Sequence, residues 1–429
     1  MKPSTTRVFL GLKVKALAAR ARGLASLTPD RVGIRPQDRR FAPSAMHFEA
    51  ANRRLQEIDK AIGKRLAFLD RHWRKASPPH VLLYIALVER EIDRARRTFG
   101  MFFEVFSQRG STFAPALAAH DAIAEDCYVA VRQGAPRMFD KEMLTPLTYM
   151  EHGYSPATMR RGVTLSRLLG ERNPFPLIRI PWDRDQPWQS VFLHEVAHNL
   201  QADLGIWQEN ERAVGSRLSH AVGDPTVVST YRRWHKEIFA DLAALLLGGP
   251  AAAWGMMNFL AHPAPRTLTY KPGGAHPTGY LRVLILCEML ARMDFEGDAA
   301  LMRRIWKRLY EPRLGSRIPA ILLQASGKTI PAVVDEIAFQ PRRNLAQRAL
   351  ADVIRFSHQD EHAIRDGARK LVHGTVPEEL PPRFMVSSGL YALTKGADPA
   401  QLSGLLNRHL SSNTFRRRAP VLATTAKAA

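Results

Sequence analysis

Apolar residues recur at helical spacing in the first third of the chain. Between residues 48 and 73, charged residues separate the apolar positions Leu55, Ile58, Ile62, Leu66, Leu69 and Trp73. A repeat of three and four positions places such side chains on one face of a helix. Pro78 and Pro79 end this pattern, and similar patterns follow over 81–106 and 116–131. The sequence therefore predicts a helical region over residues 41–150.

The pattern changes after Asn173, where residues 175–180 have the composition of a short strand. Prolines stand before, within and after it, at positions 174, 176 and 181. Because proline cannot donate a hydrogen bond to a neighbouring strand, it is expected on edge strands. The sequence therefore predicts a small sheet whose exposed edge is this strand.

Helical patterns return after the strand, up to Gln201 and over 233–247, 277–310 and 317–372. The uncharged stretch 242–261 approaches the length that spans a membrane, but Gly248, Gly249 and Pro250 interrupt it. That interruption favours one helix ending and another beginning in a buried core. The expected fold class is therefore mainly α (α+β), with a small sheet and additional helical layers.

These patterns divide the chain into five expected regions. In chain order they are a basic flexible N-terminal segment over 1–40, a helical region over 41–150, a core over 151–310, a C-terminal helical region over 311–375 and a partly disordered tail over 376–429.

Composition narrows the class of protein. Hydrophobic residues make up 45% of the chain and charged residues 24%, which excludes a wholly disordered, collagen-like or coiled-coil protein. Cys127 and Cys287 are too few for a disulfide framework, so we expect a reducing compartment, the cytoplasm. The stretch from Met1 to Pro29 holds bases and no acid, and it lacks the apolar core of a secretory signal.

The net charge of +22 favours acidic partners. No long run of bases and no alternation of bases with aromatic residues stands in the folded part, so a nucleic-acid partner is not expected. Contact with a membrane surface through the basic N-terminus remains an alternative.

One motif could bind a metal and act in catalysis. Its sequence is His194-Glu195-Val196-Ala197-His198. Histidines four residues apart lie one turn apart on the same face of a helix, so both rings can reach one Zn²⁺. The intervening Glu195 can then sit over a metal-bound water as a general base. The alternative is a helix with two ordinary surface or core histidines.

A second helical pattern offers the third ligand. The metzincin pattern requires Gly at position 201 and His at 204, where this chain has Gln201 and Leu204. Instead, Glu237 and Asp241 stand four apart on an apolar helix. One carboxylate, Glu237, can complete the zinc site, and Asp241 can orient a ligating imidazole. A solvated acidic helix face is the alternative interpretation.

Together these residues resemble the gluzincin zinc metallopeptidases, in which a His-Glu-x-x-His helix precedes a helix with a glutamate ligand. Residues 276–283, His-Pro-Thr-Gly-Tyr-Leu-Arg-Val, are similar to an element that follows in the CAAX-prenyl-protease/HtpX-like family. This resemblance covers residues 174–290 and implies a zincin-like catalytic core. It also implies that His276 and Arg282 lie near the site, as oxyanion stabilisers or organisers of the ligands. The alternative is a His-Pro turn before a helix, with Arg282 exposed.

We therefore expect a zinc metalloendopeptidase that acts on a peptide or protein substrate. Glu195 would take the proton of the metal-bound water and pass it to the leaving amine. Leu177, Ile178 and Arg179 would bind an extended substrate by strand addition. Two alternatives remain, which are a zinc-bound but inactive interaction module and a basic nucleic-acid or membrane-surface binder with a structural metal.

Overall fold

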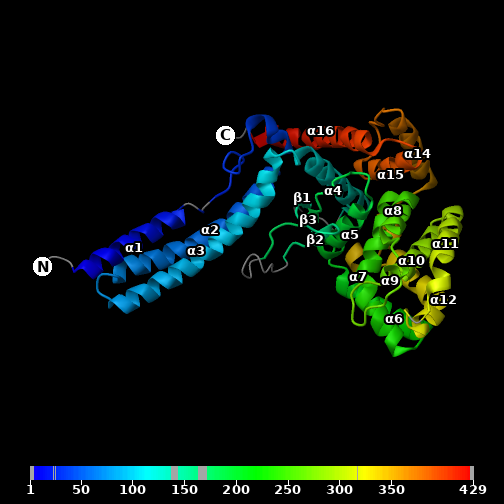
Figure 1. Ribbon diagram of the computed structural model, residues 1–429, viewed down its shortest axis with the longest axis horizontal. Coiled ribbons are helices and arrows are strands. Elements are labelled where there is room, and N and C mark those ends of the chain that lie inside the picture. The colour runs from blue at the N-terminus through cyan, green and yellow to red at the C-terminus, as the bar shows by residue number, and fades with distance from the viewer. Residues whose placement is uncertain are drawn as a thin grey trace. The chain divides into compact units, whose positions relative to one another are not determined.

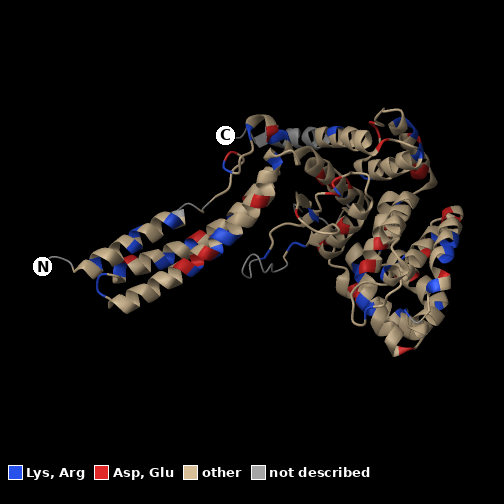
Figure 2. Ribbon diagram, viewed as in Figure 1, with Lys and Arg blue, Asp and Glu red and all other residues tan. Residues whose placement is uncertain are grey.

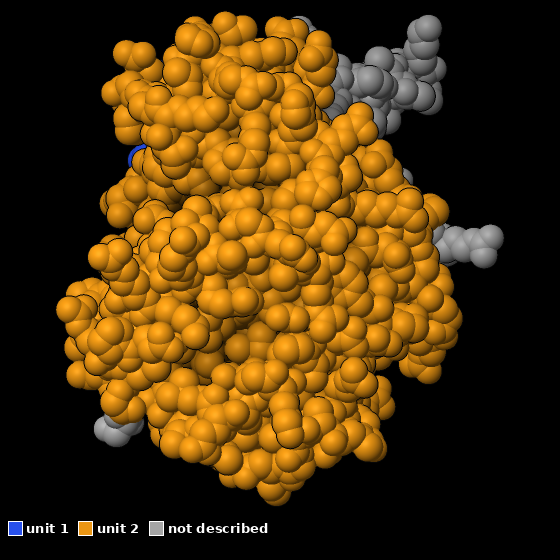
Figure 3. Space-filling model, turned by 90° about the vertical axis from the view of Figure 1, so that its right-hand side faces the viewer, with its two compact units in different colours: residues 1–114, 161–176 blue, residues 115–160, 177–429 orange. Residues whose placement is uncertain are grey.

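The computed structural model describes residues 4–136, 144–162 and 172–425, apart from residues 23, 25 and 316. The chain forms two compact units. Unit 1 comprises residues 1–114 and 161–176, and unit 2 comprises residues 115–160 and 177–429. Figure 3 shows one face of unit 2 as a continuous body. The described chain is mainly helical with one three-stranded sheet, as its pattern predicts (Figure 1).

Unit 1 is built on three long helices. These are α1 (Thr5–Arg22), α2 (Ala45–His72) and α3 (Pro78–Ser107). A short 3₁₀ turn at Pro36–Phe41 lies between α1 and α2, and another at Gln108–Gly110 follows α3. The helices predicted over 48–73 and 81–106 are thus confirmed. Figure 2 shows basic and acidic residues side by side along α2 and α3, where Arg65 and Glu91 approach to 3.1 Å.

The first 40 residues differ from the flexible segment that was expected. Leu10, Val14 and Leu17 of α1 are buried against apolar residues of α2 and α3. Arg7 donates hydrogen bonds of 2.7 and 2.8 Å to the carbonyl oxygens of Trp73 and Ala76. Arg7 lies on the same helix face as these apolar residues, so residues 5–22, which were expected to be flexible, form a helix packed against α2 and α3.

Unit 2 carries the remaining helices. In chain order they are α4 (Ala114–Gly134), α5 (Val191–Asp203), α6 (Trp207–Ala221), α7 (Pro225–Gly248), α8 (Pro250–Leu260), α9 (Ala264–Thr267), α10 (Gly279–Arg292), α11 (Glu296–Tyr310), α12 (Ala320–Val334), α13 (Leu350–Val353), α14 (His358–Val372), α15 (Pro382–Thr394) and α16 (Pro399–Thr425). α7 lies at the centre of the unit, because α5, α6, α8, α10 and α15 all pack on it.

The sheet has the strand order β1-β3-β2, with β1 at Leu147–Met150, β2 at Ala157–Met159 and β3 at Leu177–Ile180. β3 pairs in parallel with β1 and antiparallel with β2. The prediction that this strand forms the edge of the sheet is therefore wrong. Pro176 precedes the paired residues and Pro181 follows them, so neither proline removes a ladder hydrogen bond from the four-residue strand.

Gly249 separates α7 from α8, as the sequence predicts. Its φ of 68° and ψ of −160° lie in a region that residues with a side chain avoid. Pro250 then opens α8, where its missing N–H costs nothing. None of the described helices is long and apolar enough to cross a membrane.

Part of the C-terminal region that was expected to be partly disordered forms a packed helix, and residues 426–429 lie outside the described residues. Much of α15 is buried, and this helix packs on α7, α8 and α14. Ser387 donates a 2.6 Å hydrogen bond to the carbonyl oxygen of Gly248, and Ser388 donates one of 2.9 Å to that of Ile364. The expected tail therefore contributes a helix to the layer that covers the ends of α7 and α8.

Candidate metal centre

The helix that carries the His-Glu-x-x-His motif is buried on all sides. α5 is buried from Val191 to Gln201, where it packs on α7, α8 and β2. From α4, the ring of His120 meets Phe192 edge-on, and Tyr128 donates a 2.7 Å hydrogen bond to Asp203. These contacts hold α5 in one orientation, so its side chains point in fixed directions.

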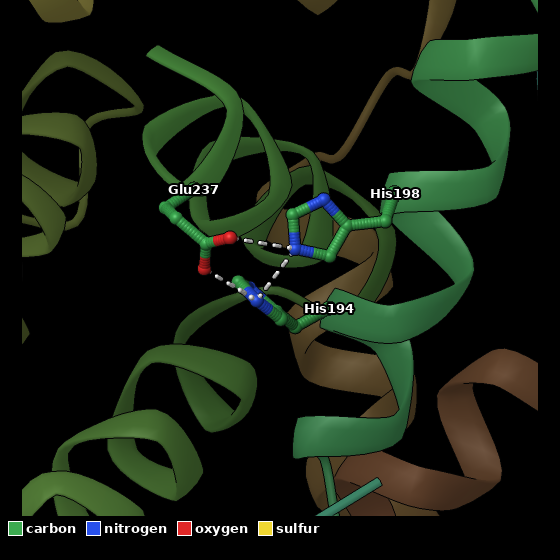
Figure 4. Close-up of side chains that lie close together, drawn as sticks. All are labelled: His194, His198 and Glu237. Carbon is green, nitrogen blue, oxygen red and sulfur yellow. Dashed lines mark hydrogen bonds and ion pairs between the residues drawn. The ribbon is translucent and has the colours of Figure 1, made fainter. Parts of the chain in front are cut away.

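Three donor side chains from α5 and α7 converge (Figure 4). The Nε2 atoms of His194 and His198 lie 3.1 Å apart. Glu237 brings Oε2 to 3.4 Å from Nε2 of His194 and Oε1 to 3.3 Å from Nε2 of His198. All three side chains are buried. The four-residue spacing thus puts both imidazoles on one face of α5, opposite a carboxylate of α7.

The donor atoms of the three residues are close enough to share one metal ion. Zinc bonds of about 2.0–2.1 Å at tetrahedral angles separate neighbouring donors by about 3.4 Å. The two Nε2 atoms lie 3.1 Å apart, each lies 3.3 or 3.4 Å from a different oxygen of Glu237, and one ligand atom from each residue lies within 4.8 Å of the other two. Two imidazoles and one carboxylate suit Zn²⁺, and three protein donors leave a fourth position for water or substrate. The residues present therefore fit this ion.

Asp241 and Arg282 support the first histidine. Oδ1 of Asp241 lies 2.9 Å from Nδ1 of His194, close enough for an ion pair, although the N–H···O angle departs from that of a good hydrogen bond. Arg282 on α10 donates from Nε to Oδ2 of Asp241 at 2.8 Å and from Nη2 to Oδ1 at 2.6 Å. A proton on Nδ1 that faces Asp241 leaves Nε2 of His194 as the donor toward the metal position.

The charges around the triad favour a cation. Burial by itself lowers the pKa of His194, but Asp241 and Glu237 raise it to about 9. Burial by itself raises the pKa of Glu237, yet His194 and His198 hold it well below its usual range. The pKa of Asp241 is also lowered despite burial, because Arg282 and His194 face it. Both carboxylates are therefore ionised at neutral pH, and they attract positive charge to the imidazoles.

Glu195 is held by a residue that the sequence did not single out. Oγ1 of Thr158 on β2 lies 2.8 Å from Oε2 and 2.8 Å from the backbone oxygen of Glu195, and it can donate its proton to one of them at a time. The Glu195 side chain is nearly buried, with 9% exposed. Thr158 lies in a three-residue strand without a motif, so no sequence signal identified it.

The two residues from the His-Pro element have different positions. Nε2 of His276 is 3.5 Å from Oε1 of Glu237, and 69% of its side chain is exposed, so His276 lies at the rim of the site. Arg282 is buried, which excludes the exposed alternative. Two nitrogens of Arg282 bind Asp241, which faces His194, and this contact agrees better with the expected organiser than with an oxyanion stabiliser. Thr278, not His276, caps α10 by accepting a hydrogen bond from the Leu281 N–H.

The expected substrate-binding strand is not available for strand addition. Leu177 and Ile178 are buried in the central strand β3. Arg179 donates to the Ser155 carbonyl oxygen at 3.4 Å and lies 3.8 Å from Glu151. Both edges of β3 are already paired, which rules out this role for the three residues. Among the described residues, β2 pairs only with β3, and it contacts α5.

Comparisons with known proteins give no indication of the activity, so the function is argued from the geometry of the site. The chain matches no protein-family model, no curated protein and no solved structure. The resemblance to gluzincins therefore rests on the motifs and their positions in unit 2.

Proposed function

We propose that this chain is a zinc-dependent peptidase with a zincin-like core of the gluzincin type. The observation that carries the proposal is a glutamate, Glu195, that neighbours His194 in the chain but is not part of the buried His-His-Glu group. A structural zinc site has its positions closed by protein donors, whereas a hydrolytic site leaves one open and adds a base. The three donors and Glu195 correspond to the second arrangement.

Each residue of the site has a role in this reaction. His194, His198 and Glu237 hold the ion, which when bound lowers the pKa of water and polarises a carbonyl group. Glu195, oriented by Thr158, takes a proton from the attacking water and returns it to the leaving amine. Asp241 and Arg282 orient His194 and touch no reacting atom. His276, at the rim, is available to a substrate carbonyl oxygen.

The position of β2 at one end of the described sheet supports a peptide as substrate. Extended peptides add to an exposed strand edge through backbone hydrogen bonds, which requires little recognition of side chains. β2 lies against α5 and carries Thr158, which contacts Glu195. A peptide along this edge would run past the metal triad. This assignment replaces the one to β3.

The test compares Glu195→Gln with the parent protein and with Glu296→Gln, which removes an exposed glutamate at the start of α11. Each protein is loaded with zinc, its metal content is measured, and a diverse peptide library is incubated with it. Because general acid–base help contributes about 10²–10⁴-fold, cleavage by Glu195→Gln should fall at least about 100-fold with zinc content unchanged. Glu296→Gln should cleave like the parent.

Two results would overturn the proposal. One is a zinc-loaded parent that cleaves no member of the library, which would leave an inactive zinc-bound interaction module. The other is cleavage that survives in Glu195→Gln or after removal of the metal with a chelator.

A further inference from the structure

The helix α1 carries apolar residues on two opposite faces. Its inner face is buried against α2 and α3. On the outer face, Val8, Phe9 and Leu12 are 49%, 59% and 62% exposed. Val8 and Leu12 lie one helical turn apart and Phe9 lies beside them, so the three side chains form one continuous surface. These three residues are called the α1 patch below.

The packing of unit 1 does not account for the α1 patch. A helix that packs on one side needs apolar residues on that side only, and its other face is normally polar. Single exposed apolar residues are common on protein surfaces, but here three large ones lie together on one face of one helix. Within unit 1 the patch faces outward, so it is available to a partner.

Bases lie next to the α1 patch, and α1 contains no acid (Figure 2). Lys15 is exposed and lies one turn beyond Leu12 on the same face, and the partly exposed Lys13 lies at the edge of that face. Among the described residues, neither Lys13 nor Lys15 forms an ion pair. Arg20, further along α1, lies 3.4 Å from Glu89 of α3. The charge beside the patch is therefore positive.

An apolar surface bordered by bases matches one kind of partner best. A helix of this kind lies in the surface of a bilayer, where its apolar side chains enter the boundary of the acyl chains and its lysines reach the headgroups. Nucleic acid offers phosphates but no apolar layer for Phe9 and Leu12. A second copy of this chain would bring Lys13 and Lys15 close to their own counterparts, and like charges repel.

We propose that the α1 patch, together with Lys13 and Lys15, binds the surface of a membrane that contains anionic lipids. The helix α1 lies parallel to that surface, and its inner face stays packed on α2 and α3. This contact goes beyond the proposed peptidase function and does not depend on the metal site, because all of its residues belong to unit 1.

The first measurement is binding of the full chain to vesicles. One set consists of phosphatidylcholine alone, and in the other set about a third of the lipid is phosphatidylglycerol. Each base close to an anionic surface strengthens binding about 5-fold, so the anionic vesicles should bind at least about 10-fold tighter in a sedimentation assay. Raising the salt from about 0.05 M to about 0.5 M should remove most of this preference, because salt screens the lysines.

The second measurement assigns the binding to α1. Phe9→Gln combined with Leu12→Gln removes most of the apolar surface, and binding to anionic vesicles should fall at least about 10-fold. Lys13→Gln combined with Lys15→Gln removes the two bases, and the preference for anionic vesicles should fall by at least about 10-fold. All four positions are at least partly exposed, so both variants should fold. Thermal unfolding checks this.

Matched control variants come from α11, which also carries exposed apolar and basic residues. Leu301→Gln combined with Leu309→Gln removes two leucines that are 42% and 45% exposed. Arg304→Gln combined with Arg308→Gln removes two exposed bases. Because each control changes the polarity or charge of the chain as much as its α1 counterpart, both should bind anionic vesicles like the parent.

Four results would overturn this membrane contact. The first is binding that is absent or equal for the two kinds of vesicle. The second is parent-like binding by either α1 variant. The third is a dimer, in place of vesicle binding, that the substitutions of Phe9 and Leu12 abolish, which would assign the patch to a second copy. The fourth is binding of a DNA duplex, in place of vesicles, that only the lysine substitutions weaken.

Discussion

Arg282 and Asp241 form a buried bidentate ion pair, with N–O distances of 2.8 and 2.6 Å. The same Asp241 oxygen that accepts from Nη2 of Arg282 lies 2.9 Å from Nδ1 of His194. The pair therefore connects α10 and α7 to the first histidine of α5. We expect the pair to hold one imidazole in position, because both Asp241 oxygens contact Arg282 and one of them also faces His194.

The first prediction concerns this ion pair. Asp241→Asn leaves Arg282 buried beside a neutral amide, and loss of one partner of a buried pair costs about 3–5 kcal/mol of unfolding free energy. Zinc affinity should also fall by roughly 10–100-fold, because His194 loses the group that orients it. Urea unfolding of the metal-free protein and competition with a chelator measure the two effects.

A double variant separates the two roles of Asp241. Asp241→Leu combined with Arg282→Met replaces both charges by apolar groups, so most of the lost stability should return. Zinc affinity should remain low, because neither new side chain can face Nδ1 of His194. Parent-like zinc affinity in the double variant would contradict the orienting role.

The second prediction concerns the proton that His194 releases when zinc binds. In the metal-free protein His194 has a pKa of about 9, so at pH 7.5 it carries a proton that zinc must displace. Zinc binding should therefore release about one proton. Isothermal titration in buffers of different ionisation enthalpy measures this number, and a binding enthalpy that is the same in all buffers would contradict it.

The same pKa predicts how stability depends on pH. His194 has a higher pKa in the folded chain than its ordinary value of 6.5, so its protonated form stabilises the metal-free fold. This contribution is complete below pH 6.5 and is lost as the pH rises through 9. His194→Gln should lack this part of the pH dependence, and urea unfolding of the parent and the variant at several pH values makes the comparison.

The third prediction tests the contact between Thr158 and Glu195. Thr158→Val keeps the shape of the side chain but removes the hydroxyl that orients the base. A hydrogen bond to a charged group is worth about 1.5–3 kcal/mol, so kcat should fall by roughly 10–100-fold with KM and zinc content little changed. Thr158→Ser keeps the hydroxyl and should retain most activity. Equal kcat values for the Val and Ser variants would remove Thr158 from the site.

The fourth prediction concerns the junction of α7 and α8. A Cβ at Gly249 would overlap the ring of Phe356, and the φ of 68° disfavours any side chain. Gly249→Ala should lower the unfolding free energy by at least about 2 kcal/mol. Gly327→Ala, at an exposed position of α12 with open space around it, should raise it by about 0.5–1 kcal/mol. Urea unfolding of both variants provides the comparison, and equal effects would contradict the strained junction.

Local pattern was sufficient for several features of this chain. The spacing of Leu55, Ile58 and Ile62 predicted α2, and Gly249 with Pro250 predicted the break between α7 and α8. The spacing of His194 and His198 placed two rings on one helix face. Each of these features depends on contacts within a few residues, where the period of the helix alone determines which side chains meet.

The sequence also associated Glu237 and Asp241 with the histidines, but it could not show which carboxylate faces which ring nitrogen. Only the packing of α5 and α10 on α7 placed Glu237 across both Nε2 atoms and Asp241 between His194 and Arg282. Helix period determines the face on which a residue lies. It does not determine which other helix that face meets.

The tertiary structure alone decided the position of β3, the contact of Thr158 with Glu195, and the packing of α1 that leaves Phe9 and Leu12 exposed. Prolines around a short strand indicate where its hydrogen bonds can begin and end, but not whether other strands lie on both sides. Thr158 and Glu195 are far apart in the chain, and no periodic pattern connects them. Such pairs are set by how the sheet and α5 pack, because that packing brings distant segments into contact.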